Sequence, residues 1–174
     1  MSIRLADISD LESILPIYAY AREQMRQNGN PDQWGTDWPS AERISMDIQC
    51  RQLYVIEQNG QIDGIFAFII GEEPTYQSIE GSWQNSLPYG TIHRIAAREG
   101  GKAVFKQCLS YCETLISTIR IDTHSRNTIM QTLLSQNGFQ PCGTIYVEDG
   151  TPRVAYQKTI EWGCCIKKNL YKIL

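Results

Sequence analysis

The sequence has neither a long apolar run nor a secretory signal. Its longest apolar run covers residues 65–70, whereas a helix that crosses a bilayer needs about 20 apolar residues. The N-terminus is polar, with Arg4, Asp7 and Asp10, and lacks the apolar stretch of a signal peptide. We therefore expect a cytoplasmic protein with no membrane partner.

Basic residues are scarce and scattered. The chain has 16 Lys and Arg against 19 Asp and Glu, which gives a net charge of −3. No basic stripe is present that could follow a phosphate backbone. This balance predicts that nucleic acid is not a partner.

The spacing of metal ligands is also missing. The two histidines, His93 and His124, lie far apart in the sequence, and no C-x-x-C pair occurs. A zinc site needs several such ligands at suitable spacing, so we expect no metal. Without an export signal the cysteines are expected to be reduced, structural thiols. They are Cys50, Cys108, Cys112, Cys142, Cys164 and Cys165.

What the chain does have is the composition of an ordinary globular domain. Of its 174 residues, 42% are apolar and 20% are charged, which is enough to bury one substantial core. We expect one domain over residues 1–158, followed by a basic C-terminal tail over residues 159–174. The sequence leaves open whether the protein is a monomer or a homodimer.

Strand and helix signals alternate along this domain. The order β-α-α-β-β-β-α-β-α-β-β predicts an α/β (α+β) fold with a mixed, mostly antiparallel central sheet of about seven strands flanked by about four helices. Strands are expected at residues 3–5, 53–56, 62–70, 91–97, 119–123, 144–147 and 154–156. Helices are expected at residues 9–27, 41–50, 104–116 and 129–137.

Local signals place some of the boundaries. Ser9-x-x-Glu12 is a capping box that predicts the start of the first helix, and Pro16 predicts a bend within it. Asn59-Gly60 is the strongest hairpin signal in the chain and predicts an antiparallel meander at the centre of the sheet. Residues 72–87 have no periodicity and are expected to form a long surface loop.

The turn after the expected strand at 91–97 is the clearest candidate binding site. Arg98-Glu99-Gly100-Gly101-Lys102 leads into a helix, and the first backbone N–H groups of a helix have no partner within it. The two glycines let an anion approach the backbone closely, while Lys102 and Arg98 add positive charge. The turn therefore predicts a phosphate-binding site.

The chain resembles the GNAT family of N-acetyltransferases over about residues 1–158. Two segments carry the resemblance. The turn satisfies the family pattern Q/R-x-x-G-x-G/A through residues 98–103, although no residues separate it from the strand. If the turn is aligned to the family by the helix that follows it, residues 101–104 take the place of the family's Gly-Lys-Gly-Ile. The segment 119–139 is similar to the family's strand, Asn-bearing helix start and closing Gly-Phe.

The resemblance implies a coenzyme A site and direct acyl transfer. Asn127 would contact the pantetheine arm, and Met130 stands where the family has a small residue. A backbone N–H near Ile95 or Ala96 would stabilise the oxyanion. The implied cofactor-binding residues are Ile95, Ala96, Ala97, Arg98, Gly100, Gly101, Lys102, Ala103, Val104, Asn127 and Met130.

The residues that move protons are less well defined. Leu134 stands where the family often has a tyrosine that protonates the departing thiolate. His93 and His124 lie on the two strands that would flank the arm, and each is a candidate catalytic base or a histidine bonded for structure. Other side chains that could reach the same cleft are Tyr89, Tyr146, Glu72 and Glu73.

Three functions fit these observations. The first is an acyl-CoA-dependent N-acyltransferase, an N-acetyltransferase that moves the acetyl group of acetyl-CoA to a small amine or a protein amino group. The second, suggested by Leu134 and the short turn, is a non-catalytic acyl-CoA-binding or regulatory module. The third is a protein-interaction domain with Trp34, Trp38 and Trp83 as an exposed apolar patch. The first two of these rings could equally line a pocket or cap the core edge.

Overall fold

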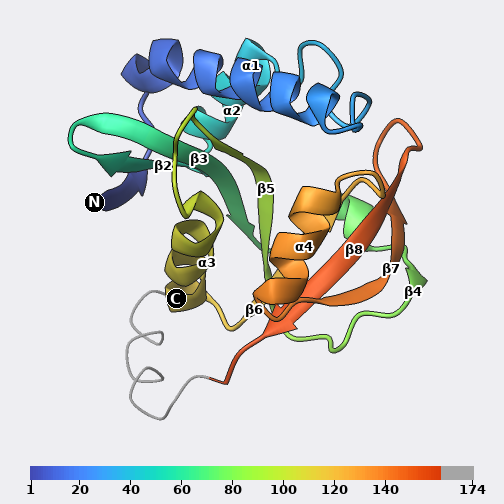
Figure 1. Ribbon diagram of the computed structural model, residues 1–174. Helices are drawn as coiled ribbons and strands as arrows, with labels where there is room; N and C mark the ends of the chain where they lie inside the picture. Colours follow the sequence, from blue (N-terminus) through green and yellow to red (C-terminus); the bar gives the residue numbers. More distant parts are fainter. Residues whose placement is uncertain (162–174) are drawn as a thin grey trace.

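The computed structural model describes residues 1–161 and shows one mixed sheet with helices on both faces (Figure 1). The strands are β1 (Ser2–Leu5), β2 (Leu53–Gln58), β3 (Gln61–Ile70), β4 (Glu80–Gly81), β5 (Gly90–Ala97), β6 (Thr118–Thr123), β7 (Gln140–Tyr146) and β8 (Pro152–Thr159). The helices are α1 (Leu11–Gln27), α2 (Ala41–Gln49), α3 (Val104–Leu115) and α4 (Thr128–Gln136), with short 3-10 helices η1 (Ile8–Asp10) and η2 (Pro74–Tyr76).

The fold class predicted from the sequence is confirmed, with two corrections to the sheet. The strand order is β1-β2-β3-β5-β6-β8-β7-β4, so the meander forms one half of the sheet and not its centre. The sheet has eight strands instead of about seven, because β4 pairs antiparallel with β7. A strand of two residues leaves no periodic signal in the sequence.

Two hydrophobic clusters lie on opposite faces of the first half of the sheet. Successive side chains of a strand point to opposite faces, and β2 accordingly sends Val55 to one cluster and Ile56 to the other. The cluster with Val55 is completed by α1 and α2, and the cluster with Ile56 by α3 and α4. Helices on both faces therefore bury strand segments that are apolar throughout, such as residues 65–68 of β3.

The Asn59-Gly60 hairpin is confirmed. Asn59 and Gly60 join β2 to β3 with φ angles of 53° and 74°. Both values lie in the left-handed region, which the favoured two-residue hairpin turn requires at its two central positions. The turn residues therefore agree with the right-handed twist of the two strands that they connect.

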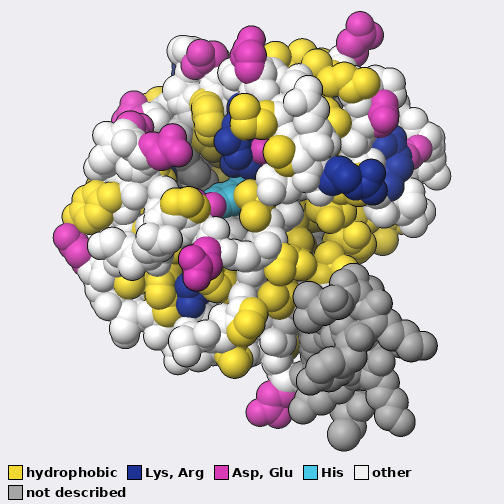
Figure 2. Space-filling model, turned by 180° about the vertical axis from the view of Figure 1, so that it is seen from behind, with side chains coloured by type: hydrophobic (Ala, Val, Ile, Leu, Met, Phe, Trp, Pro, Cys, Tyr) yellow, Lys and Arg dark blue, Asp and Glu magenta, His cyan; other side chains and the backbone are white. Residues whose placement is uncertain are grey.

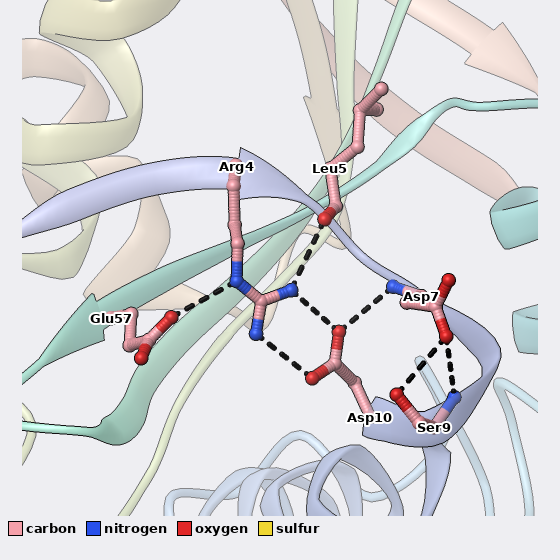
Figure 3. Close-up of polar contacts among 6 residues, drawn as sticks. All are labelled: Arg4, Leu5, Asp7, Ser9, Asp10 and Glu57. Carbon is pink, nitrogen blue, oxygen red and sulfur yellow. Dashed lines mark hydrogen bonds and ion pairs between the residues drawn. The ribbon is translucent and has the colours of Figure 1, made fainter.

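The start of the first helix differs from the predicted Ser9–Glu12 capping box. The reciprocal box is formed by Asp7 and Asp10 at η1, and α1 follows from Leu11. Arg4 explains the choice, because its guanidinium binds both oxygens of Asp10 at 2.7 and 2.9 Å and also Glu57 at 2.9 Å (Figure 3). These bonds hold β1, η1 and β2 together and lower the pKa of the Asp10 carboxyl.

Residues 72–87 are mostly exposed, as expected of a surface loop, but they are more ordered than the sequence suggests. They contain η2 and β4, and the ring of Tyr76 is buried, with its hydroxyl donating to Asp122 at 2.7 Å. The Arg120 guanidinium lies 3.9 Å from the ring centroids of both Trp83 and Tyr89. Cation–π contacts and burial thus attach this segment to β6.

The remaining expectations concern the chain end, the thiols and the membrane. β8 runs to Thr159, and the N–H of Ile160 donates to the Ser117 carbonyl. The rest of the predicted tail, from residue 162 onward and with its two cysteines, lies outside the described residues. The four described cysteines are free thiols. Within residues 1–161, no helix is both long enough and apolar enough to cross a membrane.

Candidate functional site

The sheet opens between β5 and β6, the one parallel pair among the described strands. Gly90 pairs with Ile119 and Thr91 with Arg120, and no later residue of β5 pairs with β6. Since β5 continues to Ala97, its edge beyond Thr91 carries backbone groups that β6 does not use. Such an edge can bind an extended ligand through main-chain hydrogen bonds.

A bulge in β5 lies at this opening. Arg94 and Ile95 together oppose the single residue Phe66 of β3, and Arg94 has a left-handed φ of 50°. The Arg94 carbonyl accepts a hydrogen bond from the Tyr18 hydroxyl at 2.9 Å, and its Nε donates to the buried Asp47 at 2.8 Å. A bulge bends its strand, and these contacts from α1 and α2 hold the bend.

A cleft of about 310 Å³ occupies the opening. Its walls come from the C-terminal half of α1 and the residues after it, from the end of β5 with the following turn, and from the start of α4. The cleft thus joins the free strand edge to the candidate phosphate turn. The predicted cofactor-binding residues that line it are Ile95, Ala96, Ala97, Arg98, Gly100, Gly101, Asn127 and Met130.

The other three predicted cofactor-binding residues do not line this cleft. Lys102 and Ala103 are exposed and follow the lining residue Gly101. Val104 is buried at the start of α3, so close to β3 that a Cβ on Gly64 would lie 2.5 Å from its Cγ1. Val104 therefore packs the helix onto the sheet and faces away from the cleft lining.

The two glycines of the turn are required by its backbone. Gly100 has a φ of 72°, in the left-handed region that glycine adopts without strain. A Cβ on Gly101 would lie 2.7 Å from the carbonyl oxygen of Asp63, closer than atoms can pack without a shift. Gly100 therefore lets the chain adopt this φ without strain, and Gly101 lets it pass close to β3 on its way from β5 into α3.

The turn exposes backbone donors that its own structure does not use. Gly101 donates its N–H to the Arg98 carbonyl at 2.9 Å. Within residues 1–161, no backbone carbonyl accepts from the N–H groups of residues 99, 100, 102 and 103. Ala103, the N-cap of α3, has no capping side chain. Free N–H groups at the positive end of a helix dipole make an anion site.

Arg98 is held differently from the mobile cation that we expected. Its Nε donates to Asp63 at 2.7 Å and its Nη1 to the Glu99 carbonyl at 3.0 Å. The Asp63 carboxylate neutralises much of its charge, so Arg98 supports the turn from β3. Lys102 is left as the exposed cation of the turn.

Asn127 begins α4 and is bonded through both ends of its amide. Its Oδ1 accepts the N–H of Met130 at 3.1 Å, which caps the helix, and its Nδ2 donates to Gln33 at 2.9 Å. The neighbouring residue Arg126 pairs with Asp32. The loop after α1 is therefore fastened to the start of α4 beside the cleft.

The contribution of α1 was missed from the sequence. Tyr20, Gln24 and Met25 line the cleft, yet they carry no motif and lie some 70 residues before the turn in the sequence. In the loop at residues 31–40, the sequence indicates only the aromatic rings as candidate pocket residues. Its polar residues Asp32 and Gln33 are the ones that reach α4.

His93 and Glu73 form a half-buried pair, and neither residue is part of the cleft lining. Its Nε2 lies 3.0 Å from Oε2 of Glu73, whose Oε1 accepts from Thr75 at 3.1 Å and whose N–H donates to the Tyr89 hydroxyl at 2.9 Å. The bond to His93 lowers the pKa of Glu73 to about 2. In Figure 2 a histidine side chain is visible inside a hollow bordered by acidic and hydrophobic side chains.

His124 follows β6 and is held through its Nδ1, whereas His93 is held through its Nε2. Its Nδ1 accepts the backbone N–H of Arg126 at 3.1 Å, so the neutral ring carries its proton on Nε2. Burial lowers the pKa of His124, and the positive charges of Arg153 and Arg126 lower it further. The ring is therefore neutral near pH 7 and presents an N–H donor.

The remaining candidate residues lie elsewhere. Leu134 is fully buried in the cluster with α3, so this position supplies packing. Tyr146 is exposed and donates to Glu80 at 3.0 Å, and Glu72 is exposed. Within residues 1–161, no group of three or more His, Cys, Asp and Glu side chains is placed to hold a metal ion.

No protein-family model and no curated protein sequence matches the chain. Solved structures do. A GNAT-family acetyltransferase from Streptococcus agalactiae 2603 superimposes with a TM-score of 0.84 and 31% sequence identity, over 92% of this chain and 96% of that one. The chain belongs to the GNAT family of acetyltransferases.

More distant structures show how widely this GNAT fold is shared. A GNAT-family acetyltransferase from Listeria monocytogenes 4b F2365 is 20% identical with a TM-score of 0.68, over 91% of this chain and 94% of that one. The yncA protein from Salmonella typhimurium, whose structure contains its cofactor acetyl-CoA, is 16% identical with a TM-score of 0.60, over 94% and 95%. At these identities the likeness concerns the fold alone.

The structure of this chain contradicts the hypothesis of an exposed tryptophan patch. Trp34 is buried edge-on against Tyr18 with ring centroids 5.7 Å apart, as the core-edge interpretation expected. Trp83 packs under Arg120 and donates its indole N–H to the Tyr76 carbonyl at 3.1 Å. Trp38 alone among the three is exposed, at 43%. The hypothesis of an exposed three-ring surface is therefore wrong.

Proposed function

We propose that this GNAT-family protein is an N-acetyltransferase that transfers the acetyl group of acetyl-CoA directly to an amine. The observation that carries the proposal is the single cleft that joins the free edge of β5 to the glycine turn before α3. An extended arm with a phosphate group at one end fits this arrangement. The acceptor is a small amine or a protein amino group, and the cytoplasmic location stays a prediction from the sequence.

The residues present suit the two ends of acetyl-CoA. The diphosphate would accept hydrogen bonds from the unused N–H groups of the turn and from the first turn of α3, with Lys102 adding positive charge. The pantetheine arm would lie along Ile95, Ala96 and Ala97, on the side of β5 that β6 no longer pairs with. A relative of the same fold contains acetyl-CoA, which supports this choice of co-substrate.

The reaction forms one bond and breaks one. The amine nitrogen attacks the thioester carbonyl carbon, and the tetrahedral intermediate collapses as the C–S bond breaks and the thiolate leaves with the bonding pair. A backbone N–H near Ile95 or Ala96 is proposed to stabilise the oxyanion. The proton lost by the nitrogen must go to a base, and the thiolate must gain one.

His93 is the proposed base. The Glu73 carboxylate has no proton to donate, so Nε2 of His93 must carry the hydrogen of the bond between them. In the neutral ring Nδ1 then has the lone pair that can take the proton from the acceptor's ammonium, which frees the amine nitrogen to attack. Glu73, which is anchored through Thr75 and Tyr89, fixes this tautomer.

His124 is proposed as a hydrogen-bond donor and no longer as a second base. Its Nδ1 lone pair is occupied by the Arg126 N–H, so only Nε2–H is free. A neutral imidazole N–H can stabilise a developing thiolate without transferring its proton, and water can then protonate the sulfur. In this proposal His93 takes the proton from the acceptor amine, and His124 stabilises the departing thiolate.

The test is an assay of acetyl-CoA binding followed by turnover. Millimolar acetyl-CoA should raise Tm because a ligand that binds only the folded state stabilises it. A panel of polyamines, aminoglycosides, amino acids and peptide N-termini, assayed by thiol release, should then contain at least one acceptor. An unchanged Tm at millimolar acetyl-CoA would sink the proposal.

The alternative is a non-catalytic acyl-CoA-binding or regulatory module. Buried Leu134, which cannot donate a proton, is the observation that favours it. This alternative expects the same rise in Tm but no thiol release with any amine. One amine that turns over, with the acetylated product identified by mass, would eliminate it.

A further inference from the structure

Three side-chain amides form a chain across the edge of the cleft. Asn127, at the start of α4, donates from Nδ2 to Oε1 of Gln33 at 2.9 Å. Asn30, just after α1, donates from Nδ2 to the same oxygen at 2.7 Å. The chain therefore runs Asn30, Gln33, Asn127 and links two walls of the cleft.

The direction of every bond in this chain follows from one backbone group. The N–H of Met130 can only donate, so the Asn127 atom that meets it at 3.1 Å must be Oδ1. The other end of Asn127 is then NH₂, which requires an oxygen on Gln33. That oxygen in turn requires NH₂ on Asn30, so the remaining atom of Asn30 is its carbonyl oxygen.

This oxygen of Asn30 is buried without a partner. Asn30 is 2% exposed and lines the cleft, and its Oδ1 has no hydrogen-bond donor among the described residues. The side chain is held in this orientation because Nδ2 donates to Gln33 at 2.7 Å, and the backbone is held by the bond from the Asn30 N–H to the Met25 carbonyl at 2.9 Å. A buried acceptor without a donor is costly, so a donor from the occupant of the cleft would stabilise it.

We propose that Asn30 Oδ1 accepts a hydrogen bond from an amide N–H of the pantetheine arm of acetyl-CoA. The inference rests on the proposed function, since it needs acetyl-CoA in the cleft. The arm is favoured over the acceptor amine because Gly100 and Gly101 of the phosphate turn and the free edge of β5 line the same cleft. Asn30 would be a binding residue that positions the arm opposite β5.

The amide chain offers a matched pair of substitutions for the test. Gln33→Glu keeps the oxygen that accepts from both asparagines, so the affinity for acetyl-CoA should change by less than about twofold. Asn30→Ala removes the acceptor oxygen itself. We expect Asn30→Ala to raise the acetyl-CoA Kd about three- to tenfold, the effect of one neutral hydrogen bond.

The measurement is titration calorimetry on the full chain, with Tm recorded for each variant to show that it is folded. The control ligand is 3′-phosphoadenosine 5′-diphosphate, which lacks the arm and should bind Asn30→Ala as tightly as the wild type. An unchanged acetyl-CoA Kd in Asn30→Ala, or an equal loss for both ligands, would overturn the inference alone. A wild type that does not bind acetyl-CoA would overturn the proposed function and this inference with it.

Discussion

The two ends of the proposed site are built in different ways. At the phosphate turn, backbone N–H groups point outward because Gly100 and Gly101 permit an unusual path of the chain. At the proposed catalytic end, the side chains of His93 and Glu73 meet across 20 residues of sequence. The turn depends on side chains being absent, whereas the pair depends on two particular side chains being present.

This difference determines how each end should respond to mutation. A backbone site tolerates changes of the side chains around it but not an added Cβ where the chain is tightly packed. A side-chain site keeps its structure when one member is replaced by a similar shape but loses its chemistry. Binding should therefore be sensitive at the turn, and turnover should be sensitive at the histidine.

The largest effect is expected from His93→Gln. Removing the base should lower kcat about 10²- to 10⁴-fold, the usual contribution of general base catalysis, while the acetyl-CoA Kd stays within about twofold. Steady-state kinetics with an amine that the wild type acetylates, together with calorimetry, measures both. A variant that keeps wild-type kcat would show that His93 is a structural histidine.

The next largest effect is expected from Gly101→Ala. The new Cβ would lie 2.7 Å from the Asp63 carbonyl and 3.0 Å from that of Arg98, so the turn must shift, at a cost of about 1–3 kcal/mol. We expect the acetyl-CoA Kd to rise at least about tenfold, measured by calorimetry.

Gly100→Ala is the matched control for this change. Its added Cβ would meet no atom within 4 Å, and only the φ of 72° opposes it. The free energy of unfolding should fall by about 1–2 kcal/mol, while the acetyl-CoA Kd should rise less than about threefold. Equal effects of the two substitutions on Kd would contradict the close-packed backbone site.

The same contrast explains what could be predicted from the sequence. The order of the elements, the Asn59-Gly60 hairpin and the glycine turn are local signals, because the residues that make them are neighbours in the chain. The fold and the glycine turn between β5 and α3 could therefore be predicted, whereas phosphate binding at that turn stays a prediction. The capping box forms between Asp7 and Asp10 at η1, instead of between Ser9 and Glu12, because Arg4 reaches Asp10, which is a tertiary contact.

The side-chain end of the site could be predicted only in part. His93 and Glu73 are both candidates from the sequence, but no pattern pairs them, because Glu73 lies in a segment without periodicity. The Gln33–Asn127 bond joins residues 94 apart, and Arg98 is neutralised by Asp63 on another strand. Such pairings follow from the packing of the sheet and leave no pattern in either segment alone.

A smaller effect is expected from Glu73→Gln on the pH dependence of stability. The pKa of Glu73 is lowered from 4.5 to about 2 in the fold. Its stabilising contribution is complete above the unfolded-state pKa near 4.5 and is lost as the pH falls toward about 2. Between about pH 5 and about pH 2.5 the wild type should therefore lose about 2–4 °C more in Tm than the variant. Parallel Tm curves for the two proteins would contradict the pairing with His93.

The smallest effect is expected from Lys102→Ala, which changes a side chain at the backbone end. Lys102 is exposed, and an exposed cation near an anion contributes little and is screened by salt. The acetyl-CoA Kd should rise about two- to threefold at about 0.05 M salt and less than that at about 0.3 M, as titration calorimetry can measure. An unchanged Kd at low salt would remove Lys102 from the site. A much larger loss would mean that charge, and not the backbone N–H groups, holds the diphosphate, and the contrast between the two ends would fail.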